Sequence, residues 1–332
     1  MTKIGIKDIA AEAGVSIATV SHAFRNPGRV SDKTRKKVLK AAKNLGYTPN
    51  RLASNLRTSK SGNIVVIIPD VADSYNSRII TAIEQVSHER GYSVLLGDTQ
   101  GSEERAREFA MMTSSRQADG IILMSHKLPF DTGRDEYLPP IVNGSEPTGH
   151  EGIPTVSIDD VQAGMDATMH LIEYGHKDIG VITGDIESTS SRLRLEGFKG
   201  AMSKAGLPLN ESLIEYANYT IQSGEKATKS LLLQKKRPSA IFCFSDEMAL
   251  GCIYALRQHG FRVPDDISVI GFDNIPMAHY FSPPLTTVAQ PTEDIGRVCA
   301  TLLLDLIDGK KPDEFHCILP HKLIVRQSTR RR

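Results

Sequence analysis

From residue 63 onward, short apolar runs alternate with amphipathic stretches, and this alternation restricts the possible folds more than any other feature. The runs read NIVVIIPD, SVLLGDT, DGIILMS, PPIVNG, PTVSID, DIGVITGD, SAIFCFSD and ISVIGFD. Short buried strands separated by helices are typical of parallel sheets built from βαβ units. The pattern runs once to about Asp159 and again from about Asp178. We therefore predict an α/β body of two similar lobes, with the loops after the strands facing a cleft between them.

The first 47 residues follow a helical pattern instead. Apolar residues recur at helical spacing in 6–13, 17–24 and 32–44, and Gly14 can end the first of these helices. Three short helices in this order predict a head of the helix-turn-helix kind.

The charge of the chain divides at nearly the same place. Residues 1–60 hold 13 lysines and arginines against 3 acidic residues, whereas residues 61–332 hold 27 against 36. A head of net charge +10 on a body of net charge −9 indicates a module that binds a polyanion. A flexible basic tail is the alternative, and the helical pattern of the head argues against it.

Between head and body lies TPNRLASNLRTSKSGN, residues 48–63. Pro49 cannot continue the third helix but suits the first turn of another, which can run over 51–57. A helix this short is unstable alone in water, so we expect it to fold only on contact with a partner. The serines and glycine that follow are typical of a linker.

Several classes of protein are disfavoured by what the sequence lacks. No apolar run reaches the roughly 20 residues that a membrane span needs, and no export signal is visible, so we expect a cytoplasmic protein without a membrane partner. The four cysteines lack C-x-x-C spacing, and the ten histidines are scattered without metal-ligand spacing. Motifs of serine hydrolases, phosphate loops, dinucleotide sites and zinc proteases are missing. We expect no enzyme, no metal and no cofactor.

Several longer phrases carry a resemblance to a known family. They are IKDIAAEAGVSIATVS, RVSDKTRKKVLKAAKNLGYTPN, RLRLEGF, SDEMALG, ISVIGFDN and PPLTTVAQP, in this order. Through them the chain resembles, over essentially its full length, the lactose/galactose repressor family of bacterial transcription regulators. The resemblance implies a homodimer on a near-palindromic operator. The second helix of each head would lie in a major groove, and paired hinge helices would enter the minor groove between them.

The resemblance also implies how the chain is divided. We expect a helix-turn-helix domain at 1–47, a hinge helix and linker at 48–61, and a periplasmic-binding-protein-like body for effector binding and dimerisation at 62–332. Within the body, the N-lobe would take about 62–159 and 291–320, and the C-lobe about 160–290 and 321–332. The chain ends without leucine heptads, so we expect a dimer through the faces of the body rather than a tetramer made by the tail.

On the head, the resemblance implies base contacts from Ile17, Ala18, Ser21 and His22, with Ser16 and Thr19 nearer to phosphates. The family usually has an arginine at position 22, which reads guanine through two hydrogen bonds. Histidine offers at most one good donor, so we predict weaker or altered readout, unless His22 only packs on the backbone. Further DNA contacts are expected at Arg25, Arg29, Asn50, Ala53 and Leu56, with Leu56 wedged between base steps. We expect modest operator affinity, which a second DNA-bound regulator would raise.

In the body, the resemblance implies a small-molecule effector in the cleft. Carboxylates and amides bind neighbouring hydroxyls, an arginine fixes orientation and aromatic side chains stack on a ring, which suits a sugar or a ribose. Helix capping is the alternative for two of the acidic residues, Asp246 and Asp273, and core packing for the aromatic Tyr75 and Phe242. The expected contacts are Asp70, Asp73, Tyr75, Asn143, Arg192, Arg194, Phe242, Asp246 and Asp273.

The phrases VIIPD, LLGD, LPFD and GFDN followed by PPLTTVAQP most resemble the members of the family that respond to cytidine. We therefore expect a nucleoside effector, although Asn76 stands where the family often has a second aromatic residue. Two alternatives stay open. One is the same class of regulator responding to a sugar or a purine base; the other, more remote, is a solute-binding transport protein with the same two-lobed body. The basic head and the missing export signal argue against the transport protein.

Overall fold

Three helices pack around a small apolar core to form the N-terminal head. The helices are α1 (Ile6–Ala13), α2 (Ile17–Arg25) and α3 (Asp32–Asn44), with the short 3-10 helix η1 (Pro27–Arg29) between the last two. Ile9, Val20 and Val38 supply one fully buried side chain from each helix. Gly14 ends α1 in the left-handed conformation that the sequence predicts for it. The helix-turn-helix prediction is confirmed.

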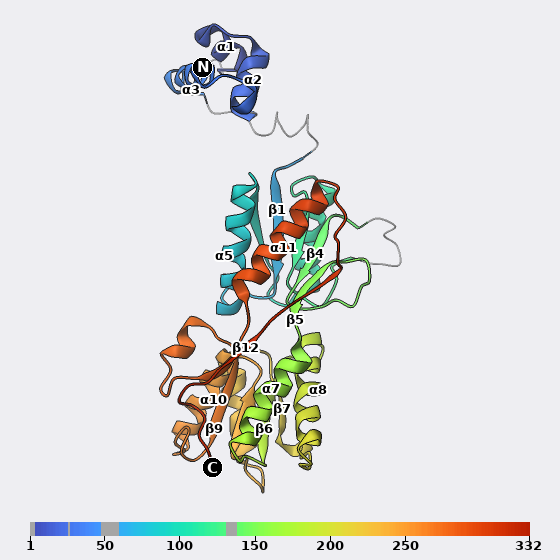
Figure 1. The fold of residues 1–332 in the computed structure, drawn as a ribbon, viewed down its shortest axis with the longest axis vertical. Coiled ribbons are helices and arrows are strands. Elements are labelled where there is room, and N and C mark those ends of the chain that lie inside the picture. Colours follow the sequence, from blue (N-terminus) through green and yellow to red (C-terminus); the bar gives the residue numbers. More distant parts are fainter. Residues whose placement is uncertain (1–3, 26, 48–59, 131–137) are drawn as a thin grey trace. The chain divides into compact units, whose positions relative to one another are not determined.

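The computed structural model describes residues 4–25, 27–47, 60–130 and 138–332, and the chain divides into two units, 1–61 and 62–332 (Figure 1). The second unit, the body, consists of two α/β lobes, each built on a six-stranded sheet. The α/β architecture of two βαβ lobes is therefore confirmed.

The first lobe has the strand order β11-β5-β4-β3-β1-β2, and all its neighbouring strands run parallel. Helices α5 and α11 cover one face of this sheet, and α6 covers the other. The elements are β1 (Asn63–Ile68), α5 (Ser74–Glu89), β2 (Ser93–Asp98), α6 (Glu103–Ser114), β3 (Ile121–Leu123), β4 (Ile141–Gly144), β5 (Thr155–Ile158), α11 (Thr292–Ile307) and β11 (His316–Leu319).

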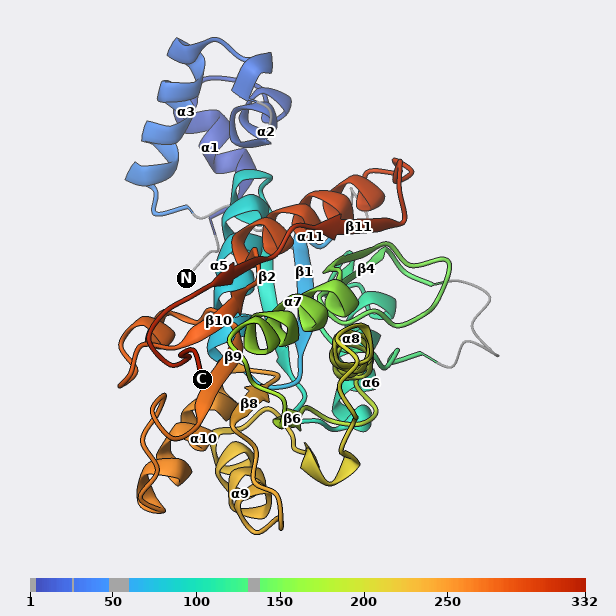
Figure 2. The ribbon, with the colours of Figure 1, turned by 60° about the horizontal axis from the view of Figure 1, so that its bottom comes forward.

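The second lobe has the strand order β12-β10-β9-β8-β6-β7, in which only the β10–β12 pair is antiparallel. The helix pairs α7–α8 and α9–α10 lie on its two faces (Figure 2). The elements are α7 (Asp160–Glu173), β6 (Ile179–Thr183), α8 (Thr189–Lys204), η2 (Glu211–Leu213), β7 (Ile214–Tyr216), α9 (Ile221–Leu232), β8 (Ala240–Cys243), α10 (Asp246–Gln258), β9 (Ser268–Asp273), η3 (Pro276–His279), β10 (Thr286–Ala289) and β12 (Lys322–Ile324).

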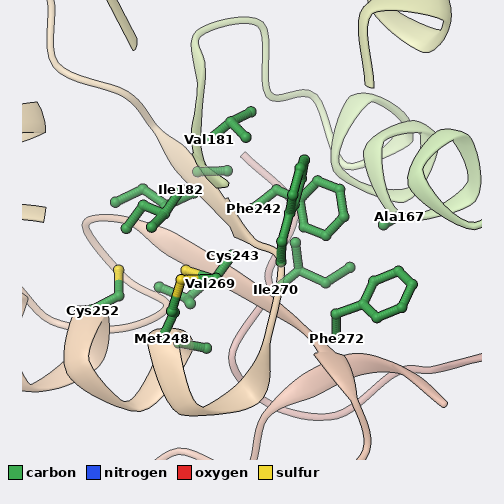
Figure 3. Packing of buried hydrophobic residues seen from close by; sticks show 14 of the residues in the cluster. Ala167, Val181, Ile182, Phe242, Cys243, Met248, Cys252, Val269, Ile270 and Phe272 are labelled. Atoms are coloured by element: carbon green, nitrogen blue, oxygen red, sulfur yellow. The ribbon is translucent and has the colours of Figure 1, made fainter. Parts of the chain in front are cut away.

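The second lobe owes its core to aromatic side chains from its central strands. The rings of Phe242 and Phe244 meet edge to face with centroids 4.9 Å apart, a geometry that aromatic pairs favour. Figure 3 shows Phe242 and Phe272 among the apolar side chains of this core. All three phenylalanines are fully buried, so they fix the strand ends from which the loops of the cavity begin.

Helices α7 and α8 touch through their backbones at two glycines. A Cβ atom on Gly197 would lie 2.1 Å from the carbonyl oxygen of Val161, and one on Gly164 would lie 2.4 Å from that of Arg194. No real side chain tolerates such distances, so only glycine allows the helices to approach this closely. The approach brings Arg194 of α8 against Asp160 of α7.

We predict that Gly197→Ala destabilises the body by about 1–3 kcal/mol, because the added methyl group must push two helix backbones apart. Gly200→Ala on the same helix is the matched control. Its Cβ would meet only the flexible end of Met165, at 3.1 Å, and alanine favours helix by about 1 kcal/mol over glycine. Thermal unfolding should show a lower midpoint for Gly197→Ala alone. Equal midpoints for the two variants would contradict this packing.

Candidate functional site

A cavity of about 380 Å³ lies between the lobes of the body, and loops from both lobes line it. Its volume falls within the range of small-molecule sites in proteins. The first lobe contributes Asp70, Asp73 and Tyr75 from the loop after β1 and the start of α5. The second lobe contributes Arg194 and Asp273. These five are sequence-predicted effector residues, and the fold brings them together from positions up to 203 apart in sequence.

Asp73 begins helix α5 and faces the cavity. Its carboxylate accepts hydrogen bonds from the backbone N–H of Tyr75, at 2.8 Å, and from the amide nitrogen of Asn76, at 3.0 Å. Burial, together with the nearby carboxylates of Glu247 and Asp70, raises the pKa of Asp73 from 3.8 to about 6, despite these hydrogen bonds. Asn76 is thus a buried support for the acid and takes the place of a second aromatic side chain.

Tyr75, Gln290 and Asp273 form a chain of hydrogen bonds along the wall. The Tyr75 hydroxyl lies 2.7 Å from the Ser145 hydroxyl and 3.1 Å from Oε1 of Gln290. The amide nitrogen of Gln290 donates to Asp273, at 2.8 Å. Burial holds the pKa of the Asp273 carboxyl well above its usual value, even though Arg194 lies close enough to lower it. The chain therefore offers a ligand several oxygen acceptors in fixed positions.

Arg194 is buried at the side of the cavity formed by the second lobe. Its Nε donates to Asp160 and its Nη1 to the backbone oxygen of Phe244, both at 2.8 Å. The guanidinium also stacks on Phe272, 3.7 Å from the ring centre. Burial alone would lower the pKa of Arg194, and attraction to Asp160, Tyr219 and Asp273 outweighs it, so the group stays charged. An arginine held at three points can present its remaining N–H groups in a fixed direction.

A second cluster of hydrogen-bonded polar residues connects the two lobes. Glu146, after β4, accepts hydrogen bonds from the Ser188 hydroxyl, at 2.8 Å, and from the backbone N–H of Ser190, at 3.1 Å. The hydroxyl of Tyr219 lies 3.2 Å from that of Ser188. Glu146 therefore binds the N-terminal end of helix α8 from the opposite lobe, where a negative charge is favourable. These residues line the cavity and were not predicted from the sequence.

Four sequence-predicted effector residues do not line the cavity. Asn143 is fully buried and its amide donates to the backbone oxygens of Leu123 and Ser125, so it holds the loop after β3. Phe242 is a core residue, and Arg192 is exposed with a hydrogen bond to Thr189 on its own helix.

Asp246 is the fourth of these residues. It accepts hydrogen bonds from the backbone N–H of Ile275, at 2.8 Å, and from the Thr287 hydroxyl, at 2.6 Å. Burial raises its pKa to about 7, and the two hydrogen bonds oppose this rise. The carboxyl thus fixes loops behind the cavity wall. Asp246, Phe242 and Asn143 are thus buried and Arg192 is exposed, and none of the four lines the cavity.

The outer face of helix α2 carries the predicted base-contacting residues. Ile17 is 46% exposed, which is unusual for an isoleucine, and Ala18 beside it is exposed as well. Ser21 and His22 are half-buried, whereas Val20 and Ala23 point into the core of the head. Ile17 and Ala18 are therefore fully available to a partner, and Ser21 and His22 are partly available.

The other predicted DNA contacts are divided between described and undescribed parts of the chain. The Ser16 hydroxyl accepts from the backbone N–H of Thr19, at 3.1 Å, so it caps helix α2. Arg29 is exposed in η1. Asn50, Ala53 and Leu56 lie outside the described residues, as does the side chain of Arg25.

Comparison with known proteins decides the family. Residues 5–50 match the sequence model of bacterial regulatory proteins of the lacI family, and residues 168–329 match that of a periplasmic binding protein-like domain. The chain is 40% identical to the HTH-type transcriptional repressor CytR of Escherichia coli K12, over 99% of this chain and 97% of CytR. The chain belongs to the LacI family. It is a DNA-binding repressor with an effector-binding body and not an enzyme, and the resemblance in its sequence phrases is confirmed.

Other LacI-family proteins share this architecture. The HTH-type transcriptional repressor PurR of Vibrio campbellii is 33% identical over 98% of both chains. The crystal structure of the lac repressor dimer, bound to operator and an anti-inducer, superimposes with a TM-score of 0.87 at 27% identity, over 99% of this chain and all of the other. CytR, PurR and the lac repressor are thus all similar to this chain. The fold therefore does not identify the effector, which must be inferred from the side chains in the cavity.

The part of the chain that the structure describes has no helix long and apolar enough to cross a membrane. Across the same residues, no group of three or more histidine, cysteine, aspartate and glutamate side chains could hold a metal ion.

We predict that Asp73→Asn makes the body more stable at neutral pH. Because the pKa of Asp73 rises from 3.8 to about 6 on folding, the wild-type protein loses stability as the pH rises between these values. Asparagine keeps the capping oxygen without the charge, and the Asn76 amide can turn to accept from it. Thermal unfolding between pH 4 and 8 should show a gain above pH 6 that shrinks towards pH 4.

The exposed Asp313→Asn is the control for this measurement and should give no such pH-dependent gain. A constant difference between Asp73→Asn and wild type at every pH would refute the electrostatic explanation.

Proposed function

We propose that the protein is a homodimeric repressor whose binding to a near-palindromic operator is modulated by a nucleoside, with cytidine as the first candidate. The observation that carries the effector proposal is the set of acceptors around Asp73, Tyr75 and Asp273. Neighbouring hydroxyls of a ribose can donate to such carboxylates, and a base can stack on tyrosine. Bacterial operator DNA lies in the cytoplasm, where the protein would act.

The charge of the cavity favours a neutral effector over a phosphorylated one. Among the described residues, its wall carries seven carboxyl groups and three lysines or arginines. All three of these cations already have partners, since Arg194 pairs with Asp160, and both Lys127 and Arg107 pair with Glu103. A phosphate group would add like charge to this wall and leave it unpaired, which costs affinity. We therefore propose a nucleoside rather than a nucleotide.

Similarity to CytR over the full chain supports the nucleoside, and similarity to PurR keeps a purine base as the second candidate. A nucleoside and a free purine base would make different contacts in the cavity. A nucleoside brings ribose hydroxyls to Asp73 and Asp273, whereas a free base brings none. Calorimetric titration with cytidine, adenosine, hypoxanthine, ribose and galactose separates these candidates.

The DNA-binding half of the proposal rests on the exposed face of α2 and on the charge of the head. The proposed second copy would cover apolar side chains exposed on the body. Leu96 on the edge strand β2 is 46% exposed, and Tyr280 next to η3 is 76% exposed. A dimer would place two heads on two half-sites, which one small head needs for discrimination. Sedimentation should give a dimer, and a stable tetramer would contradict the proposal.

We predict that cytidine binds the wild-type protein and that cytidine 5′-monophosphate binds at least about tenfold more weakly, a difference of about 1.4 kcal/mol. Asp273→Asn should weaken cytidine binding by a similar factor, because it replaces one carboxyl oxygen of the cavity wall with an NH2 group, which cannot accept a hydrogen bond from a ribose hydroxyl. Arg192→Gln is the control, since Arg192 is exposed and does not line the cavity. Equal affinity for the nucleoside and the nucleotide would rule out the charge argument.

On the DNA side, we predict that His22→Ala lowers affinity for the best operator by about fivefold, because one base contact is lost. Affinity for a scrambled sequence should stay the same, since phosphate contacts supply non-specific binding. The measurement is fluorescence anisotropy on the operator and its single-base-pair variants. If His22→Ala bound every variant as the wild type does, His22 would have no part in readout.

A further inference from the structure

The turn that carries Asp273 has an unusual backbone. Asp273 ends strand β9 with a φ angle of 109°, and Asn274 follows it with a φ angle of 54°, so two successive non-glycine residues lie at positive φ. L-amino acids adopt such angles only when their surroundings hold them there, and positions of this kind cluster at ligand sites. The direction of the Asp273 carboxyl into the cavity therefore depends on whatever holds this turn.

The backbone of the turn is bound by groups of the second lobe and by one residue of helix α5 in the first lobe. The N–H of Asn274 donates to the Thr287 hydroxyl, at 3.3 Å, and the N–H of Ile275 donates to Asp246, at 2.8 Å. Arg78 of α5 reaches the Asn274 backbone oxygen at 3.4 Å, which is long for a hydrogen bond. None of these groups engages the side chain of Asn274.

Arg326, in the segment after β12, does engage that side chain. One nitrogen of its guanidinium donates to Oδ1 of Asn274, and the other donates to the backbone oxygen of Leu285, both at 2.7 Å. Its own backbone N–H donates to the Thr286 hydroxyl, at 2.9 Å. The guanidinium thus connects the turn after β9 to the residues that lead into β10. A rigid planar fork fixes the distance between two acceptors, which the single ammonium of a lysine does not.

We propose that Arg326 is a positioning residue for effector binding. By donating a hydrogen bond to the side chain of Asn274, it holds the strained turn so that Asp273 faces the cavity. Arg326 itself does not line the cavity and acts only through the turn. The inference rests on the proposed function to the extent that Asp273 is an effector contact. Whether Arg326 stabilises the turn can be tested without any effector.

The experiment compares four single variants of the full-length protein and one double variant, Arg326→Gln with Asn274→Gly. Arg326→Gln and Arg326→Lys remove the fork, and Asn274→Gly removes its acceptor while suiting the positive φ. Arg330→Gln is the matched control, because Arg330 lies in the same C-terminal segment but pairs with Asp265 at the surface. Hydrogen exchange is measured at the Ile275 amide, and cytidine affinity is measured by calorimetry.

We expect Arg326→Gln to lower protection of the Ile275 amide by about tenfold and cytidine affinity by about fivefold, with the control unchanged. Arg326→Lys should restore little of either. The double variant with Asn274→Gly should be no weaker than Arg326→Gln alone, because both changes break the same contact. Should Arg326→Gln fail to fold, the comparison of Arg326→Lys and Asn274→Gly with the control decides the question.

Wild-type protection and wild-type affinity in Arg326→Gln would overturn the inference, as would equal losses in Arg330→Gln. If cytidine binds the wild type and Asp273→Asn loses binding while Arg326→Gln does not, the proposed function stands and the positioning role falls. If no ligand of the panel binds the wild type, the proposed function falls, and the exchange measurement still decides whether Arg326 holds the turn.

Discussion

The body of this protein depends on one buried guanidinium. Arg194 of α8 meets Asp160 of α7, the end of β8 through Phe244 and the ring of Phe272 in β9. A buried charge with a missing partner costs several kcal/mol, so these elements must meet in one arrangement. Two glycines make the meeting possible by letting the helix backbones touch. The second lobe therefore presents a cation of fixed position to the cavity.

The rest of the cavity is arranged around that cation as a set of acceptors. Asp73 and Tyr75 come from the first lobe, and Asp273 and Gln290 lie on the chain that leads back to it. Because the acids outnumber the cations, a ligand gains most by bringing hydrogen-bond donors without negative charge. A ligand shared by two lobes favours one arrangement of them, and this is the requirement for coupling an effector to DNA binding.

The sequence predicted the fold well because each signal was local and repeated. Buried strands appear as short apolar runs, and β1 is buried on both faces as NIVVII suggests. Cavity residues were predicted where they directly follow such a run, as Asp70 and Asp273 do. Asp246 follows a run as well, but it is tied to Ile275 and Thr287 behind the wall, and the sequence contains no sign of that difference.

The residues that the sequence did not reveal depend on contacts across the fold. Glu146, Ser188 and Tyr219 meet over separations of tens of residues, and each alone is an ordinary loop residue. Among the cavity residues that were not predicted, Gln290 had the clearest indication in the sequence, because it directly follows β10 within the phrase TTVAQP. No local pattern in the sequence indicates a role for Arg326, since its partners lie about 40 and 50 residues earlier in the chain. Local periodicity reports burial, whereas the grouping of polar side chains is decided by the order of the strands.

The most direct test of this account is a crystal structure of the protein with cytidine. We expect ribose hydroxyls within hydrogen-bond distance of the Asp273 carboxyl, and we expect Arg194 to be still bound to Asp160 and stacked on Phe272. Cytidine bound outside the cavity between the lobes would contradict the proposed site. Arg194 turned away from Asp160 to meet the ligand would contradict the claim that its buried ion pair fixes the cavity.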